Sequence, residues 1–336
     1  MKISIIIPVY NGEKNIYQCY DSLVKQKYAK WEAIFIDDGS SDGSVGILKQ
    51  ICEMDNRCSY ISEPNSKQMV ARYNGIDMAT GDYCAFLDVD DTLESNALDE
   101  IDTIASRFNP DIIMFNGIRI DRSTGEKYKM WDHLSETPHF YKNEEYKKLR
   151  WLAIDGRRLN NICFKAIKTT ILKKSKAYTD CKFIRNEEDL LMQLPYLDLA
   201  NNLFYIPLNL YLYTVNEKSS SKTYDENFYK SSCFIYHELL KYGAKWKADD
   251  YKRKCNTKIC EAAIFSVISG CEYLSKSNWY NIVTRIVESK EFQKASRFSH
   301  NHMSLTKKVF AQAMRFHANC IVYFISKYEI LHGYDS

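Results

Sequence analysis

Short apolar runs alternate with amphipathic stretches along the first third of the chain. Between the runs, apolar side chains recur at helical spacing, as with Ile16, Cys19, Tyr20 and Leu23. This alternation predicts strands joined by helices in a parallel sheet. The expected strands are residues 3–9, 31–36, 58–62, 83–87 and 111–116, and the expected helices are 13–26, 44–55 and 68–79, the last capped by Gly81.

The pattern changes in the rest of the chain. Residues 117–225 are mixed, with a helix around Trp151 and Leu152, a strand at 203–213 and a loop marked by the serines 219–221. From residue 226 onward the apolar spacing is helical. We therefore expect an α/β fold with a mostly parallel central sheet, followed by a helical C-terminal region. The expected parts are residues 1–116, 117–225 and 226–336.

Composition fits a globular chain with a sizeable core. Of the 336 residues, 45% are hydrophobic and only 12 are Gly and 6 Pro, which argues against disorder. The 11 cysteines include no C-x-x-C pair, which predicts free, mostly buried thiols. The longest apolar run, residues 320–325, is far too short to cross a bilayer, and the start lacks a secretory pattern. We expect a cytoplasmic protein.

Charge is distributed unevenly. The 46 basic and 43 acidic residues nearly balance, which gives no reason to expect binding to nucleic acid. Residues 226–336 hold 17 basic and 10 acidic side chains, a net charge of +7, whereas residues 1–225 hold 29 and 33, a net charge of −4. An acidic first part and a basic tail indicate two different roles.

Polar motifs follow three of the expected strands at their carboxyl ends. They are Tyr10-Asn11, Asp37-Asp38, and Asp88 to Asp91. Open parallel sheets bind ligands in the crevice outside the carboxyl ends of their strands. The placement therefore predicts a nucleotide site.

The segment Asp88-Val89-Asp90-Asp91 has two interpretations. Carboxylates this close are costly to keep ionised unless a cation neutralises them, and oxygen ligands suit Mg²⁺ or Mn²⁺. Alternatively the segment starts a helix, with Asp91 or Thr92 as N-cap. The buried strand before it favours the metal.

Two other acidic motifs are ambiguous by themselves. The carboxylate of Asp38 can hydrogen-bond a base or a ribose, but Asp37-Asp38-Gly39-Ser40 also suits a plain turn. Asn186-Glu187-Glu188-Asp189 offers a general base, but also fits Asn186 as N-cap with acids in the first turn.

Taken together, the motifs resemble the nucleotide-binding half of family 2 glycosyltransferases, which have the GT-A fold. The likeness covers residues 1–116 and, through Glu188-Asp189, extends to about 225. The motifs that carry it are Ser4-Ile5-Ile6-Ile7-Pro8-Val9-Tyr10-Asn11, Ile36-Asp37-Asp38-Gly39-Ser40-Ser41-Asp42-Gly43, Ala71-Arg72, and Gly81-Asp82-Tyr83-Cys84-Ala85-Phe86-Leu87-Asp88-Val89-Asp90-Asp91.

The resemblance implies an inverting, nucleotide-sugar-dependent hexosyltransferase of the bacterial surface-polysaccharide type. UDP is the expected donor nucleotide, with GDP and TDP as alternatives, and the acceptor is a saccharide or lipid-linked saccharide. By the same resemblance Asp189 is the catalytic base and Mn²⁺ or Mg²⁺ the cofactor. It places Pro8, Tyr10, Asn11, Asp38, Arg72, Asp88 and Asp90 at the nucleotide, and Asp90 and Asp91 at the metal.

Three positions depart from the family pattern. Lys67 stands where the family usually has Gly, and Tyr73 where it usually has Asn, so both are candidates for donor specificity. The family often has Tyr-x-Tyr-Arg in a later strand, whereas here Tyr211-Leu212-Tyr213 is followed by Thr214. A phosphate contact by that arginine is therefore not expected.

Three other functions fit the sequence less well. Asp88-Val89-Asp90-Asp91-Thr92 fits the D-x-D-x-T signature of haloacid-dehalogenase phosphatases, but strands precede it that should follow it. No G-x-G-x-x-G follows the first strand, which argues against a dinucleotide oxidoreductase. A catalytically degenerate scaffold is disfavoured because Asp38, Asp90 and Asp189 are intact.

The basic tail has two interpretations of its own. Residues 305–331 mix apolar side chains with Lys307, Lys308, Arg315 and Lys327, a pattern that predicts an amphipathic helix. Such a helix packs on the catalytic domain or on a second copy in a homodimer, or it lies on the inner face of the plasma membrane. The sequence leaves these alternatives open.

Overall fold

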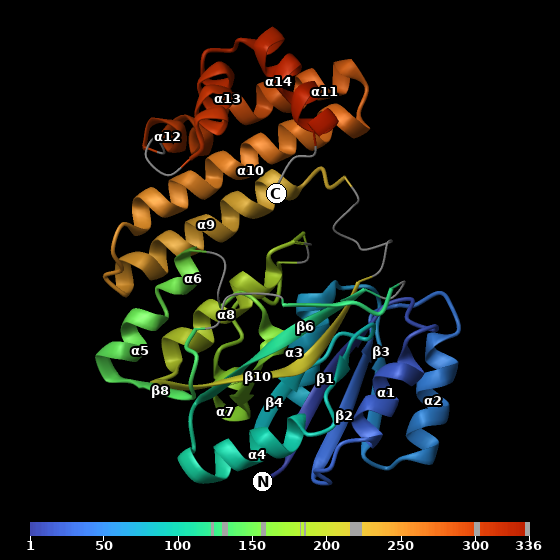
Figure 1. Cartoon of the computed structure of the whole chain (residues 1–336). Coiled ribbons are helices and arrows are strands. Elements are labelled where there is room, and N and C mark those ends of the chain that lie inside the picture. Colours follow the sequence, from blue (N-terminus) through green and yellow to red (C-terminus); the bar gives the residue numbers. More distant parts are fainter. Residues whose placement is uncertain are drawn as a thin grey trace. The chain divides into compact units, whose positions relative to one another are not determined.

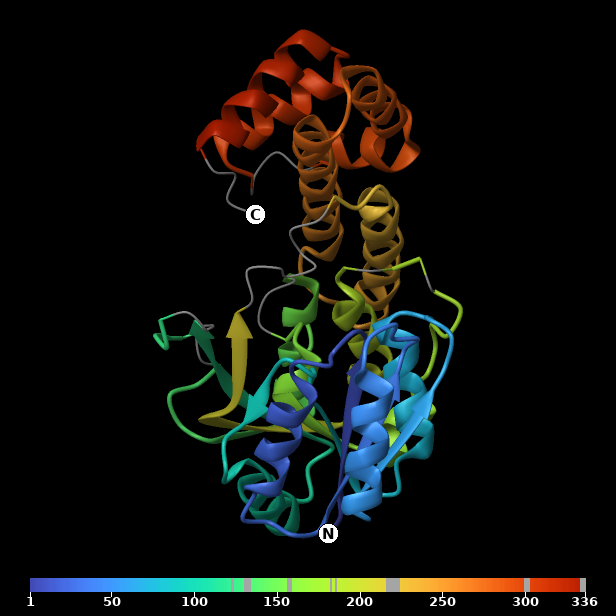
Figure 2. The ribbon, with the colours of Figure 1, turned by 90° about the vertical axis from the view of Figure 1, so that its right-hand side faces the viewer.

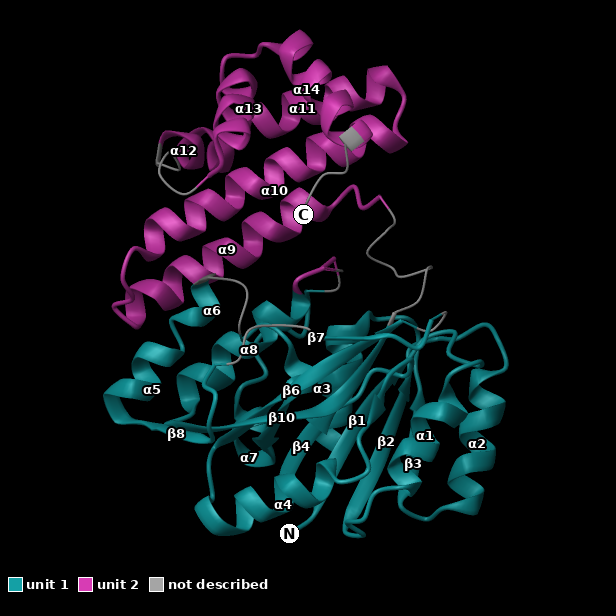
Figure 3. Cartoon of the chain, in the orientation of Figure 1, with its two compact units in different colours: residues 1–182, 188–219 teal, residues 183–187, 220–336 magenta. Residues whose placement is uncertain are grey.

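The computed structural model describes residues 1–121, 124–129, 134–155, 159–181, 183–184, 186–215, 224–298 and 303–332. The chain divides into two compact units (Figure 3). Unit 1 holds residues 1–182 and 188–219, and unit 2 holds residues 183–187 and 220–336. The predicted boundary serines 219–221 lie outside the described residues. The division into 1–116, 117–225 and 226–336 stays a prediction, but residues 183–187 belong to the later unit.

Unit 1 is built on one open ten-stranded sheet (Figure 1). Its first half has the order β3-β2-β1-β4, all parallel. The elements of this half are β1 (Ile3–Val9), α1 (Ile16–Val24), β2 (Trp31–Asp37), α2 (Ser44–Met54), β3 (Cys58–Ser62), α3 (Gln68–Met78) and β4 (Tyr83–Phe86). They confirm the predicted α/β pattern, each within a few residues of its expected bounds.

Right-handed crossovers place the helices on both faces of this sheet (Figure 2). The chain moves outward through β1, β2 and β3 and then returns to β4, so α1 and α2 share one face and α3 covers the other. Gly75 of α3 lets that helix approach closely, since a Cβ there would lie 2.5 Å from Cγ2 of Ile6. The strand side chains between the helices are the core, and Ile3, Ile5, Ile6, Ile7 and Val9 are all fully buried.

The second half of the sheet is mixed rather than parallel. Its elements are β5 (Thr92–Leu93), α4 (Ala97–Phe108), β6 (Ile112–Asp121), β7 (Lys127–Lys129), β8 (His139–Lys142), α5 (Asn143–Leu149), α6 (Leu152–Asp155), a 3-10 turn (Ile162–Phe164), β9 (Lys165–Lys168), α7 (Thr169–Lys174), α8 (Glu188–Leu199) and β10 (Asn202–Val215). Strand β9, missed by the sequence prediction, lies antiparallel between β4 and β6. Strand β10 pairs parallel with β6 and antiparallel with β5 and β8.

One local prediction in unit 1 is wrong, and one of the two interpretations of the acidic segment 88–91 is excluded. Gly81 is not the cap of α3, because that helix ends at Met78 with Ala79 extended. Gly81 instead passes close to β1, where a Cβ would lie 2.8 Å from the carbonyl oxygen of Lys2. Asp91 does not start a helix either, since Thr92 and Leu93 form β5 and α4 begins only at Ala97.

Unit 2 is helical throughout its described residues, as predicted. Its helices are α9 (Phe228–Lys245), α10 (Tyr251–Tyr273), α11 (Lys276–Glu288), α12 (Lys290–Phe298), α13 (Leu305–Arg315) and α14 (Asn319–His332). The single tail helix expected over 305–331 is in fact two. His317 takes a left-handed φ of 54°, and Ala318 N–H donates to the carbonyl of Ala313, which is the Schellman pattern that ends a helix.

The state of the cysteines and the character of the helices agree with what the sequence predicted. All 11 cysteines are free thiols, and all but Cys52, Cys181 and Cys320 are buried. Among the described helices, none combines the length and apolar character that crossing a bilayer requires.

Candidate active site

The polar strand ends predicted from the sequence meet in unit 1. Strand β1 lies between β2 and β4, with Val9 opposite Asp37 and Ile6 opposite Phe86. The loops that follow these three strands therefore leave the same edge of the sheet. This is where a doubly wound sheet binds its ligand.

The first two of these loops are tied together by Asn11. Its side-chain oxygen accepts from Ser41 N–H at 2.8 Å, and its backbone N–H donates to Ser40 Oγ at 2.9 Å. Pro8 is buried in β1, whereas the Tyr10 ring is 57% exposed. A fixed loop with an open aromatic side chain provides a surface on which a planar ring can stack.

Asp38 faces the loop that starts α3. Its carboxylate is 4% exposed and accepts backbone N–H groups from Ser66 and from Lys67, the latter at 3.0 Å. Burial raises the pKa of Asp38, although the two N–H donors oppose the shift. Lys67 has φ 75° and ψ 157°, a region that almost only glycine adopts. This conformation accounts for the glycine that the family usually places there, and it aims the Lys67 N–H at Asp38.

Arg72 of α3 is the centre of the acidic cluster. Its side chain is 2% exposed, and its guanidinium donates to Asp88 at 2.9 Å and to Asp189, while Glu188 lies 3.9 Å away. Gln68, one turn earlier on α3, donates to the same oxygen of Asp88 at 2.8 Å. The buried cation thus connects the end of β4 with the start of α8. The sequence placed Arg72 near the nucleotide but gave no sign of its link to Asp189.

Asp91 faces inward and is 1% exposed. It accepts the Tyr211 hydroxyl at 2.6 Å and Thr214 N–H at 2.7 Å, so it fixes β10 to the acidic loop. Burial and the charges of Asp88 and Asp90 raise the pKa of Asp91 to about 8. Thr214, which replaces the family's arginine, contributes its backbone here. Both Asp91 oxygens are engaged in this way, whereas Asp88 and Asp90 are half-buried.

The donor set suits a hard divalent cation. Across the described residues, no three His, Cys, Asp or Glu side chains gather into a closed metal cluster. Mg²⁺ characteristically uses one or two carboxylates and completes its shell with water and substrate phosphates. Burial is the main cause of the raised pKa of Asp91, and a cation at this loop would offset only the smaller contribution from the charges of Asp88 and Asp90. The residues present therefore fit Mg²⁺ or Mn²⁺.

The acids of the segment 187–189 have different partners. Asp189, in the first turn of α8, accepts from Arg72 on one oxygen and from Ile162 N–H at 3.1 Å on the other. Burial, and then the charge of Asp189, raise the pKa of Glu188 to about 7. Glu187 belongs to unit 2, where it accepts the Tyr236 hydroxyl at 2.6 Å. Because α8 starts at Glu188, its N-cap position is Glu187 rather than Asn186, and the amide of Asn186 donates to Asp225 at 3.1 Å.

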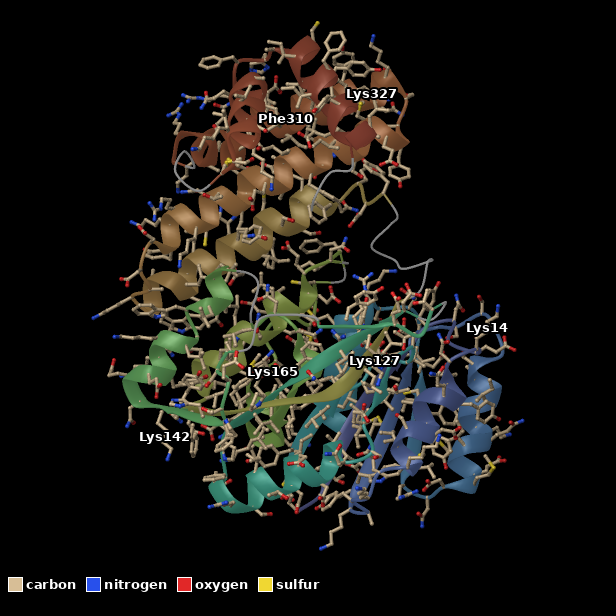
Figure 4. The ribbon with its side chains drawn as sticks, in the orientation of Figure 1. Lys14, Lys127, Lys142, Lys165, Phe310 and Lys327 are labelled. Carbon is tan, nitrogen blue, oxygen red and sulfur yellow. The ribbon has the colours of Figure 1, made fainter. Side chains whose placement is uncertain are left out.

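Lys165 supports Asp189 indirectly, through the backbone of residues 159–162. Nothing in the sequence identified Lys165 as a site residue. It lies on β9 (Figure 4), is fully buried, and donates to the carbonyl oxygens of Leu159 at 2.7 Å and Asn161 at 2.5 Å. Burial lowers its pKa to about 8. The segment it holds ends at Ile162, whose N–H donates to Asp189.

Of the two specificity candidates, Lys67 contacts a predicted site residue directly. Its backbone touches Asp38, and its ammonium donates to Asn65 at 2.7 Å. Tyr73 is 2% exposed, with the Lys176 ammonium 5.8 Å from its ring centroid.

The sequence of the chain is similar to those of known glycosyltransferases. A family model described as glycosyl transferase family 2 matches residues 4–175. Glycosyltransferase GlyA of Streptococcus pneumoniae is 28% identical over 237 residues, which cover 68% of this chain and 32% of GlyA. Glycosyltransferase GlyG of the same organism is 28% identical over 232 residues, 66% of this chain and 73% of GlyG. The chain thus spans about a third of the length of GlyA.

A solved structure resembles the chain over almost its full length. S. aureus TarS 1–349 in complex with UDP-GlcNAc has a TM-score of 0.69 and 20% identity, covering 99% of this chain and 92% of that chain. At this identity the likeness establishes the fold, and the predicted GT-A architecture with a helical C-terminal region is confirmed.

Proposed function

Because the chain belongs to glycosyl transferase family 2, we propose that it moves a hexose from a nucleoside diphosphate sugar to an acceptor hydroxyl with inversion. The observation that carries the proposal is the contact of buried Arg72 with Asp88 and Asp189. One side chain thereby holds the donor-side strand end and the acceptor-side acid in a fixed relation. A UDP-sugar is the first donor to test, since the structural neighbour TarS 1–349 was solved with UDP-GlcNAc.

In this proposal the strand-end loops hold the nucleotide. Tyr10 stacks on the base from the loop that Asn11 fixes, and Pro8 forms the buried wall beneath. Asp38 accepts a hydrogen bond from the base through a lone pair that the Ser66 and Lys67 N–H groups leave free. Asp88 lies at the ribose and diphosphate, held in place by Gln68 and Arg72.

We place Mg²⁺ or Mn²⁺ at Asp90. The sequence also predicted Asp91 as a metal ligand. Because both of its oxygens accept hydrogen bonds from Tyr211 and Thr214, we propose that Asp91 positions the acidic loop and that Asp90 alone binds the cation. When bound, the cation would offset the charge that develops on the departing diphosphate.

Asp189 is the proposed base. Its carboxylate takes the proton from the acceptor hydroxyl, whose oxygen then attacks the anomeric carbon opposite the diphosphate. Arg72 and Ile162 N–H orient that carboxylate. A single displacement of this kind inverts the anomeric configuration and needs no covalent intermediate.

A transfer assay tests the reaction class. Wild type, Asp189→Asn and Glu188→Gln would be incubated with nucleotide sugars and saccharide acceptors, and the product anomer read by NMR. The proposal requires an inverted product and loss of turnover with retained donor binding in Asp189→Asn. A retained anomer would refute the mechanism. Donor binding without turnover on any acceptor would favour the scaffold alternative.

The phosphatase alternative is contradicted by the family assignment. In addition, its D-x-D-x-T signature follows β4, after three strands of the sheet, rather than the first strand.

The acceptor in this proposal is a saccharide or lipid-linked saccharide. For unit 2 we propose contact with an anionic membrane surface. Phe310 of α13 and Val322 of α14 are buried, yet the same two helices and the turn between them also expose large apolar side chains. Phe316 is 72%, Phe324 73% and Leu331 80% exposed. Exposed apolar side chains in such number are unusual on a surface that meets only water.

The charge of these helices suits anionic lipid. Residues 303–332 carry Lys307, Lys308, Arg315 and Lys327 against Glu329 alone. Phe316→Glu with Phe324→Glu should abolish sedimentation with vesicles containing phosphatidylglycerol, whereas Met54→Glu, at an exposed position of unit 1, should not. If the protein instead forms dimers in the absence of vesicles, and the same double variant disrupts them, membrane contact is contradicted and a homodimer is favoured.

A further inference from the structure

Unit 2 contains a cavity of about 370 Å³ outside the site described above. Its volume falls in the range of small-molecule pockets. The wall is formed by the segment before α9, the end of α10, and one face of α11. The described residues that line it are Tyr224, Glu226, Leu274, Asn278, Asn281, Ile282 and Arg285.

One side of the cavity is apolar and fixed. The Tyr224 ring stacks on Tyr273, with centroids 6.3 Å apart and planes at 29°. It also rests on α10 at Gly270, where a Cβ would lie 3.8 Å from the ring. Leu274 and Ile282 extend this surface. A fixed aromatic ring beside aliphatic side chains suits the C–H face of a flat ring.

The opposite side is polar and nearly neutral. Asn278, Asn281 and Arg285 are spaced by three and four residues, so they share one face of α11 with Ile282. All three are exposed, and each amide offers both donors and an acceptor. Arg285 lies 3.8 Å from Glu226, and both are more than 60% exposed, so the pair is weak and open to a competing ligand.

This combination selects a class of ligand. Glu226 offsets Arg285, which disfavours a phosphate or another anion. Amides that both donate and accept match hydroxyl groups, which also do both. A ring with an apolar face and a hydroxylated edge is a sugar.

We propose that this cavity binds a sugar residue of the acceptor glycan. The identification of the ligand as acceptor rests on the proposed function, whereas the binding of a saccharide to unit 2 does not. The cavity would hold the glycan on the enzyme between encounters with the donor, because a second point of attachment raises the effective concentration of the chain end.

The test measures saccharide binding to the full chain by saturation-transfer NMR, with methyl glycosides of glucose, galactose, N-acetylglucosamine and rhamnose as probes. Asn281→Leu and Ile282→Trp, which remove an amide and fill the cavity, should each weaken binding of the preferred probe at least tenfold. Thr284→Leu, at an exposed position of α11 outside the cavity, should leave it unchanged. Because Asn281 is exposed, its variant retains the fold even where Ile282→Trp does not.

Three results would overturn the inference. They are absence of binding by any probe at millimolar concentration, unchanged binding in Asn281→Leu, and binding lost in Asp38→Asn instead. UDP-sugar binding measured on the same samples shows whether a negative result concerns the cavity alone or the proposed function as well. If the chain binds UDP-sugar but none of the glycosides, the cavity is not a saccharide site, and the proposed glycosyltransferase function is unaffected.

Discussion

Arg72→Met should destabilise unit 1 by removing the only guanidinium in direct contact with Asp88 and Asp189 among the described residues. Methionine keeps much of the aliphatic volume but leaves Asp88, Glu188 and Asp189 without the guanidinium that pairs with all three. Breaking a buried ion pair costs about 3–5 kcal/mol. The three carboxylates are 27%, 15% and 23% exposed, so water compensates part of this, and we expect a loss of about 2–4 kcal/mol.

The loss should depend on pH in a defined direction. The pKa of Glu188 is already raised to about 7, and Arg72 opposes the shift, so the variant raises it further. A carboxyl whose pKa is higher in the folded state destabilises the fold when ionised and not when protonated. The stability difference between wild type and variant should therefore be largest near pH 8.5, shrink as pH falls toward 7, and have lost its Glu188 contribution by pH 6.

The assay is urea unfolding followed by circular dichroism at pH 8.5 and pH 6. Lys147→Met provides the control, because Lys147 pairs with Glu144 at the surface of unit 1, where the two side chains are 55% and 77% exposed, and its loss should change stability little at both pH values. An equal loss in the two variants, or a loss in Arg72→Met that does not change with pH, would refute the reasoning.

Three further predictions concern residues around the site. Lys67→Gly should stabilise the protein by about 1 kcal/mol in urea unfolding, because glycine relieves the strained φ of 75° at a partly offsetting entropic cost; destabilisation would count against strain. Lys165→Met should lower kcat while leaving the donor Kd unchanged, since Ile162 N–H loses its support beside Asp189; equal effects on both would indicate a general structural role. Glu188→Gln should raise Tm at pH 8 more than at pH 5, because it removes an acid whose pKa of about 7 penalises the fold when ionised; a pH-independent change would contradict that assignment.

The sequence placed the site because its signals are local. Apolar runs ending in polar motifs located the loops after β1, β2 and β4, and parallel topology then brought Asn11, Asp38 and Asp88 to one edge of the sheet. Helix and strand bounds in this half follow from periodicity alone.

What escaped prediction depends on contacts between distant parts of the chain. Arg72 and Asp189 are separated by 117 residues, and no spacing rule connects them. Strand β9 is short and contains Lys165, whose burial depends on carbonyl partners rather than on the apolar pattern. The end of α13 at His317 depends on a left-handed residue that is not glycine, so the usual helix-stop signal is missing.

We expect the edge formed by β1, β2 and β4 to bind a nucleoside diphosphate sugar together with a divalent cation. The most direct measurement is calorimetric titration of UDP-sugars into wild type, Asp38→Asn and Asp90→Asn, each with Mg²⁺, Mn²⁺ or EDTA. Asp82→Asn, at the opposite end of β4, is the control. We expect metal-dependent binding by wild type and control, at least about tenfold weaker binding in Asp38→Asn, and loss of the metal dependence in Asp90→Asn. Binding that is equal in all four proteins, or indifferent to metal in wild type, would contradict this expectation.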